Sequence, residues 1–130
     1  MGCNNPRLGM TIHGTAIEFT RGDAESLTFT KDRLNDENEY EPSPFVTGDI
    51  LDLTVRTRQV SDSVVIHKRV TEFTEDGAAI FRFYPENTKN LPFKEERKEY
   101  VYDIQWTSVD GMVQTLVDES PFILRRDSTR

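Results

Sequence analysis

The sequence predicts an all-β fold, a sandwich or barrel of seven or eight short strands. Apolar and polar residues alternate with a period of two through most of the chain, and clusters of Gly, Pro, Asn or Asp recur about every 8 to 15 residues between these runs. No segment has the 3.6-residue period of a helix longer than one or two turns. A chain of 130 residues also has the length of one domain.

The first predicted strands are separated by a glycine turn. Four apolar residues precede the Arg-Gly-Asp at 21–23, namely Ile12, Ala16, Ile17 and Phe19. After it, Leu27 and Phe29 alternate with Ser26, Thr28 and Thr30. Gly-Asp between two β segments is typical of a turn, so a cell-adhesion interpretation of this tripeptide is disfavoured. We expect residues 1–10 to be a disordered leader, residues 11–126 to form the sandwich domain and residues 127–130 to be a disordered tail.

An acidic segment follows at residues 32–44. It is rich in Asp, Glu and Asn and contains Pro42 and Pro44, a composition typical of a loop. Calcium binding is the alternative for Asp32 to Glu41, but an EF-hand loop requires Gly at its sixth position, where this chain has Glu37. Whether this loop binds an ion stays open.

Further strands are predicted at residues 50–56, 64–70 and 79–84, each preceded by a turn signal. The inward face of the second of these is ambiguous, because both of its faces carry apolar and polar residues. Residues 85–92 begin and end with Pro and predict one helical turn whose Leu91 enters the core.

The C-terminal region, residues 99–124, predicts a three-stranded antiparallel meander. Residues 99–106 alternate strictly, Asp110-Gly111 is a hairpin signal, residues 112–117 form the second strand, and residues 122–124 after Ser120-Pro121 form the third. A two-residue turn places one set of side chains on a shared apolar face. These are Tyr102, Ile104, Trp106, Val113, Thr115 and Val117. A longer loop starting at Ser108 keeps the hairpin but shifts this register.

Composition excludes several classes of partner. The formal charge is −7, from 23 acidic and 16 basic residues, and this repels nucleic acid and anionic membranes. The sequence contains neither an apolar run long enough for a membrane span nor the apolar core of a signal peptide, so we expect cytoplasmic synthesis. The single Cys3 excludes an intramolecular disulfide and a thiolate metal cluster.

The residues available for catalysis are few. His13 lies near the N-terminus and His67 lies mid-strand, where a structural role on a strand face is expected. No nucleophile elbow, phosphate loop or dinucleotide motif is present, so we expect no enzyme, no catalytic residue, no bound metal and no cofactor. Asp103 interrupts an apolar strand; it faces solvent, or it is buried and hydrogen-bonded.

Four aromatic residues allow a second interpretation. Trp106, Tyr84, Tyr40 and Phe45 could stack on a sugar, although aromatic residues at strand positions are more often part of the core. A carbohydrate-binding module is therefore the alternative function.

Three segments resemble a known module. The Arg-Gly-Asp and alternating run at 21–29, the Gly-Asp strand at 48–55 and the Tyr-x-Tyr-Asp-Ile-Gln strand with its Gly hairpin at 100–116 resemble a module of Gram-positive phage and prophage structural proteins. The N-terminal domains of some upper baseplate proteins are similar. The resemblance implies a single immunoglobulin-like antiparallel β-sandwich and no catalytic residue.

The function predicted from these observations is that of a non-enzymatic virion structural protein of a tail, baseplate or capsid. It would act by protein–protein assembly, with other virion proteins or further copies of itself as partners, and move from the bacterial cytoplasm into the virion. The predicted partner-binding face is the outer face of the C-terminal hairpin. Its residues are Val101, Asp103, Gln105, Gln114 and Leu116.

Overall fold

The computed structural model describes residues 11–13, 16–57, 63–91 and 95–126. Its elements, in chain order, are β1 (Thr11–His13), β2 (Ala16–Thr20), β3 (Glu25–Phe29), β4 (Asp32–Leu34), β5 (Tyr40–Pro42), β6 (Ile50–Thr57), β7 (Val64–Val70), β8 (Ala79–Phe83), α1 (Pro85–Thr88), β9 (Arg97–Thr107) and β10 (Val113–Arg125). The predicted leader and tail lie outside the described residues. No helix within the described ranges is long and apolar enough to cross a membrane.

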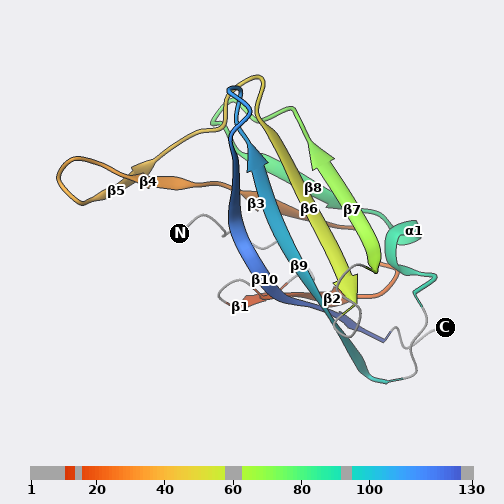
Figure 1. Ribbon diagram of the computed structural model, residues 1–130. Helices are drawn as coiled ribbons and strands as arrows, with labels where there is room; N and C mark the ends of the chain where they lie inside the picture. Colours follow the sequence, from red (N-terminus) through yellow and green to blue (C-terminus); the bar gives the residue numbers. More distant parts are fainter. Residues whose placement is uncertain (1–10, 14–15, 58–62, 92–94, 127–130) are drawn as a thin grey trace.

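The prediction of an all-β sandwich is confirmed. Six strands form one sheet in the order β1-β2-β10-β9-β6-β7, and β3 pairs with β8 in a second layer (Figure 1). The order β10-β9-β6-β7 is that of strands G, F, C and C′ of an immunoglobulin variable-type sheet, and β3-β8 corresponds to B and E. One pairing departs from the antiparallel expectation, because β2 runs parallel to β10.

The core lies between these two layers. Alternate residues of β2, β6 and β9 on one side and of β3 and β8 on the other are buried, as the period of two requires. The largest fully buried side chains are Tyr102, Phe19, Phe29, Phe81, Phe83 and Phe122. Phe122 contacts the rings of Phe19, Phe83 and Tyr102 with centroid distances of 5.6, 5.6 and 6.2 Å.

The predicted meander is wrong in its third strand and in its register. β10 is a single strand from Val113 to Arg125, and Ser120-Pro121 lies within it rather than between two strands. The strand tolerates Pro121 because a register shift immediately precedes it, between Val117 and Ser120, and Pro is accommodated next to such irregularities.

The hairpin between β9 and β10 follows the longer alternative. The Ser108 N–H donates to the Met112 carbonyl at 2.9 Å, so the loop starts at Ser108. Gln114 therefore lies opposite Trp106. A register shift between Thr115 and Val117 then places Val117 opposite Ile104. Val113 is 59% exposed and does not lie on the apolar face.

The structure also shows which face of β7 is buried and where the predicted helical turn lies. In β7, Ile66 is buried opposite Val55, and a register shift beside it lets Val65 pack against the core as well. The predicted helical turn is α1, and Leu91 beyond it packs against the core as expected. The Arg21 guanidinium donates to the Leu91 carbonyl at 3.0 Å, so the Arg-Gly-Asp turn is tied to this segment.

Candidate functional site

The acidic segment is a hairpin, not the loop that its composition predicts. We call β4, β5 and the turn between them the arm, Asp32–Pro42. It projects from the sandwich, away from α1 (Figure 1). Leu34 lies opposite Tyr40, and these side chains are 54% and 72% exposed. The arm thus presents an apolar pair that the described part of the chain leaves exposed.

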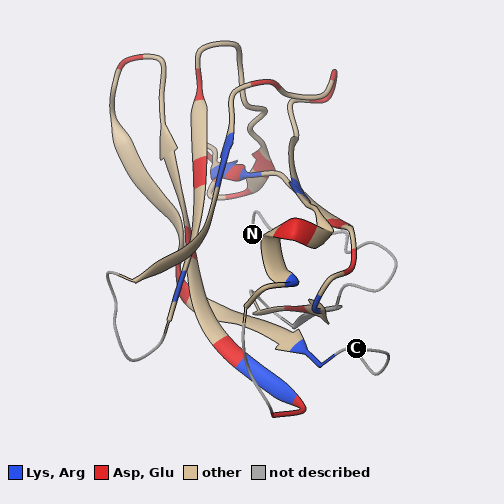
Figure 2. Cartoon of the chain, turned by 90° about the vertical axis from the view of Figure 1, so that its right-hand side faces the viewer, with Lys and Arg blue, Asp and Glu red and all other residues tan. Residues whose placement is uncertain are grey.

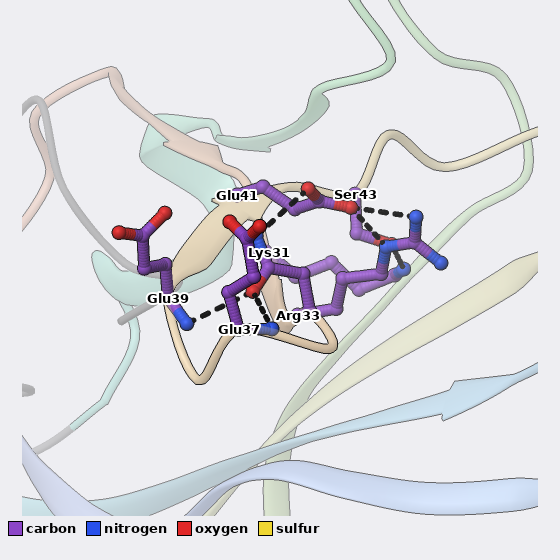
Figure 3. A network of polar contacts seen from close by, with 7 residues as sticks. Lys31, Arg33, Glu37, Glu39, Glu41 and Ser43 are labelled. Atoms are coloured by element: carbon purple, nitrogen blue, oxygen red, sulfur yellow. Dashed lines mark hydrogen bonds and ion pairs between the residues drawn. The ribbon is translucent and has the colours of Figure 1, made fainter.

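Hydrogen bonds from within the arm fix its shape (Figure 3). The Asn35 Oδ1 atom accepts the backbone N–H groups of Glu37 and Glu39 at 2.8 and 3.0 Å, which closes the turn. The Arg33 Nε atom donates to the Glu41 carboxylate across the hairpin at 2.7 Å. This hydrogen bond, with a second from Asn35, lowers the pKa of Glu41. The arm is therefore ordered by its own side chains.

The sandwich carries three connections at the end from which the arm projects. We call residues 31–49, 71–78 and 108–112 together the loop end. The Phe45 N–H donates to the Gly77 carbonyl at 3.0 Å, which joins the first two segments. Gly48 packs so closely on Val109 that a Cβ atom there would lie 2.4 Å from the valine Cγ1 atom. These contacts hold the three segments together.

A depression of about 420 Å³ lies in the loop end, at the base of the arm. Val46, Val109 and Met112 line it, and they are 54%, 58% and 68% exposed. We call these three side chains the apolar patch. Contiguous exposed apolar residues of this kind mark interaction sites in soluble proteins.

Trp106 forms part of the same depression. The Lys31 Nζ atom lies 4.3 Å from the centre of its ring and donates to Ser43 Oγ at 2.7 Å. Burial lowers the pKa of Lys31, and the Asp49 carboxylate acts in the opposite direction. The Trp106 Nε1 atom is buried without a hydrogen-bond partner in the part of the chain that the structure describes. This is the one tryptophan of the sequence.

The predicted partner-binding face is not assembled as expected. Val101, Asp103 and Gln105 alternate along one face of β9, as predicted. Gln114 lies opposite Trp106 and lines the depression instead. Leu116 lies at a register shift and packs against the core. The two departures have different causes. The loop that starts at Ser108 sets Gln114 opposite Trp106, and the register shift between Thr115 and Val117 makes Leu116 the extra residue of a bulge.

Ion pairs dominate the outer face of the large sheet. Each of three partly buried carboxylates binds an arginine of another strand of this sheet. The pairs are Asp103 with Arg56 at 2.5 Å, Asp52 with Arg69 at 2.8 Å and Glu18 with Arg97 at 3.3 Å. His67 also contacts Asp52 at 2.8 Å, which agrees with its predicted place on a strand face. A partner docking here would have to desolvate ion pairs that are already formed, and that cost opposes binding.

The four aromatic residues considered for sugar binding do not form one platform. Phe45 is 3% exposed, and Trp106 is covered on one face by Lys31. Tyr84 precedes α1, far from Tyr40 on the arm, and Lys68 lies over its ring at 5.2 Å. Among the residues described, no group of three His, Cys, Asp or Glu side chains is placed to hold a metal ion.

Comparisons with known proteins identify no family. No family model matches the chain, and no curated protein matches it. A solved structure of murine CRIg is similar, with a TM-score of 0.41 and 12% identity over 96% of this chain and 100% of that chain.

The loop end could not be read from the sequence as a site. Its apolar residues are isolated in polar segments that lie far apart in the chain, so no local pattern marks them. The available signal for the arm was Asn35, which lies between the apolar residues Leu34 and Tyr40. An Asn side chain can close a turn by accepting backbone N–H groups.

Proposed function

We propose that the chain is a non-enzymatic structural protein of a bacteriophage or prophage particle and acts by protein–protein assembly. The observation that carries the assembly role is the loop end, where the apolar patch and the Leu34–Tyr40 pair remain exposed beside an internally fixed arm. Apolar side chains that are exposed next to one another mark interaction sites in soluble proteins, whereas single exposed ones are ordinary. The resemblance of residues 21–29, 48–55 and 100–116 supports the assignment to a tail, baseplate or capsid.

The loop end replaces the outer sheet face as the proposed contact surface. The outer face satisfies its charges within the chain, whereas the apolar patch lacks cover from the described residues. Its partners are other virion proteins, reached after synthesis in the bacterial cytoplasm.

Loss of the gene from a producing bacterium tests this function. Negative-stain electron microscopy of particles made with and without the protein should show a missing density or a failed assembly step, and expression of the wild-type chain in trans should restore it. Normal particles without the protein, together with no binding to purified tail, baseplate or capsid proteins, would refute the proposal. A glycan array distinguishes the carbohydrate-binding alternative, because an assembly protein should give no signal on it.

A further inference from the structure

The negative charge of the chain is concentrated at the loop end. Residues 31–49, 71–78 and 108–112 contain ten acidic and two basic residues, a net charge of −8. The rest of the chain contains thirteen acidic and fourteen basic residues, a net charge of +1, and together they give the total of −7. Figure 2 shows Asp and Glu in the loops at the upper end of the molecule. The sandwich is thus nearly neutral apart from this end.

Three acidic side chains of the arm are exposed to solvent. Asp36, Glu37 and Glu39 are all exposed at its turn. The turn uses only backbone groups of Glu37 and Glu39: both N–H groups donate to Asn35 Oδ1, and the Glu39 carbonyl accepts the Asn35 N–H at 2.9 Å. Their carboxylates are therefore not required for the hairpin and remain available to a partner.

The acidic residues of the loop end surround the apolar patch. Val46 and Met112 line the depression together with Asp110, and so does Lys31, the residue directly before the arm. An apolar centre with a charged rim is the arrangement of a protein–protein interface, in which the centre supplies affinity and the rim supplies orientation and association rate.

We infer that the loop end docks a different protein, whose contact surface has an apolar centre ringed by Lys and Arg. A second copy of this chain is the wrong occupant, because contact between two loop ends would bring two regions of charge −8 together. A basic partner gains from both features at once: its apolar centre covers the patch and its cations face the arm. This inference rests on the proposed assembly function and assigns its surface and the chemistry of its partner.

Binding measurements with defined probes test the inference. The probes are the products of the genes that flank this one, each purified separately, and the readouts are biolayer interferometry and the fluorescence of Trp106. One probe should bind, with slower association at about 0.3 M salt than at about 0.05 M, because salt screens charge steering. Its contact surface should be rich in Lys and Arg, and its binding should change the emission of Trp106.

Two matched pairs of variants locate the contact. Val46→Lys should weaken binding at least about tenfold, whereas Val64→Lys should leave it within about twofold. The two valines are 54% and 51% exposed, and Val64 lies at the start of β7. The double variant Glu37→Gln/Glu39→Gln should slow association several-fold, and the control Glu95→Gln/Glu96→Gln, also at exposed positions, should not.

Three outcomes would overturn the inference. Equal effects of Val46→Lys and Val64→Lys on a probe that binds would place the contact elsewhere and leave the assembly function intact. Sedimentation showing a dimer that Val46→Lys dissociates would make a second copy the occupant. Absence of binding by every probe would remove the basic partner, and the microscopy of deletion particles then decides the assembly function separately.

Discussion

Three glycines at the loop end allow a graded test of how its segments are held together. Gly48, Gly77 and Gly111 have φ values of +103°, +79° and +86°, a region in which L-residues are strained. Their surroundings differ. An added Cβ atom would meet nothing within 4 Å at Gly111, the side chain of Val109 at 2.4 Å at Gly48, and both side-chain and backbone atoms of Pro44 at 2.3 and 2.9 Å at Gly77.

The expected costs follow from these distances. Gly111→Ala introduces only backbone strain, about 1–2 kcal/mol. Gly48→Ala adds a displacement of Val109, a side chain that is 58% exposed and can change rotamer, so we expect about 2–3 kcal/mol in all. Gly77→Ala should cost about 3–5 kcal/mol, because the clash with Pro44 involves a rigid ring and the backbone beside it.

Urea unfolding followed by Trp106 fluorescence measures the three free energies of unfolding. The double variant Gly48→Ala/Val109→Ala is the control, since it removes the clash and keeps the strain; its stability should approach that of Gly111→Ala. A Gly77→Ala variant no less stable than Gly111→Ala would show that Pro44 does not press on Gly77, and the packing of the loop end described above would be wrong.

Three further substitutions test the rest of the sandwich. Phe122→Ala should lower the free energy of unfolding by about 3–5 kcal/mol in urea titrations, because the side chain is fully buried among aromatic rings. Thr88→Val should cost about 1–3 kcal/mol by the same measurement, because its buried hydroxyl accepts a backbone N–H at 2.7 Å. Burial acts to raise the pKa of Asp52, but hydrogen bonds from Arg69 and His67 outweigh it and hold that pKa below the ordinary value of an aspartate. The carboxylate therefore stabilises the fold above the pKa of an unfolded aspartate and ceases to do so as the pH falls through its lower folded pKa. Asp52→Asn should cost about 1 kcal/mol at pH 7 and nothing at the acid end of a pH series of thermal melts.

The sandwich was predictable because period-two alternation has one physical cause. A strand with one buried face must place apolar residues at every second position, and β6 meets this condition at Leu51, Leu53 and Val55, which are all buried. α1 was predictable for a similar local reason, since Pro85 fits the first position of a helix. Neither inference required knowledge of distant contacts.

The face of the C-terminal hairpin could not be predicted by counting from the turn. Counting assumes that every residue on one strand has one partner, and β10 breaks this rule twice. At the shift between Val117 and Ser120, two residues of β10, Asp118 and Glu119, lie opposite the single Asp103 of β9. Such bulges depend on how β10 bends to pair with β2 as well as β9, and that contact is remote in sequence.

The charge of the arm is not explained by folding. Like charges crowded at one end oppose the compact state, and a sandwich of this kind can neutralise its carboxylates, as it does at Asp52 and Asp103. The hairpin needs Asn35, the pair of Arg33 with Glu41, and two backbone N–H groups, but not the carboxylates of Glu37 and Glu39. Neutral residues at those two positions would form the same turn with less repulsion. Glu37 and Glu39 thus lower the stability of the fold, and this favours a role for their carboxylates in binding another protein. A cationic partner surface that covers the apolar patch would pair with them.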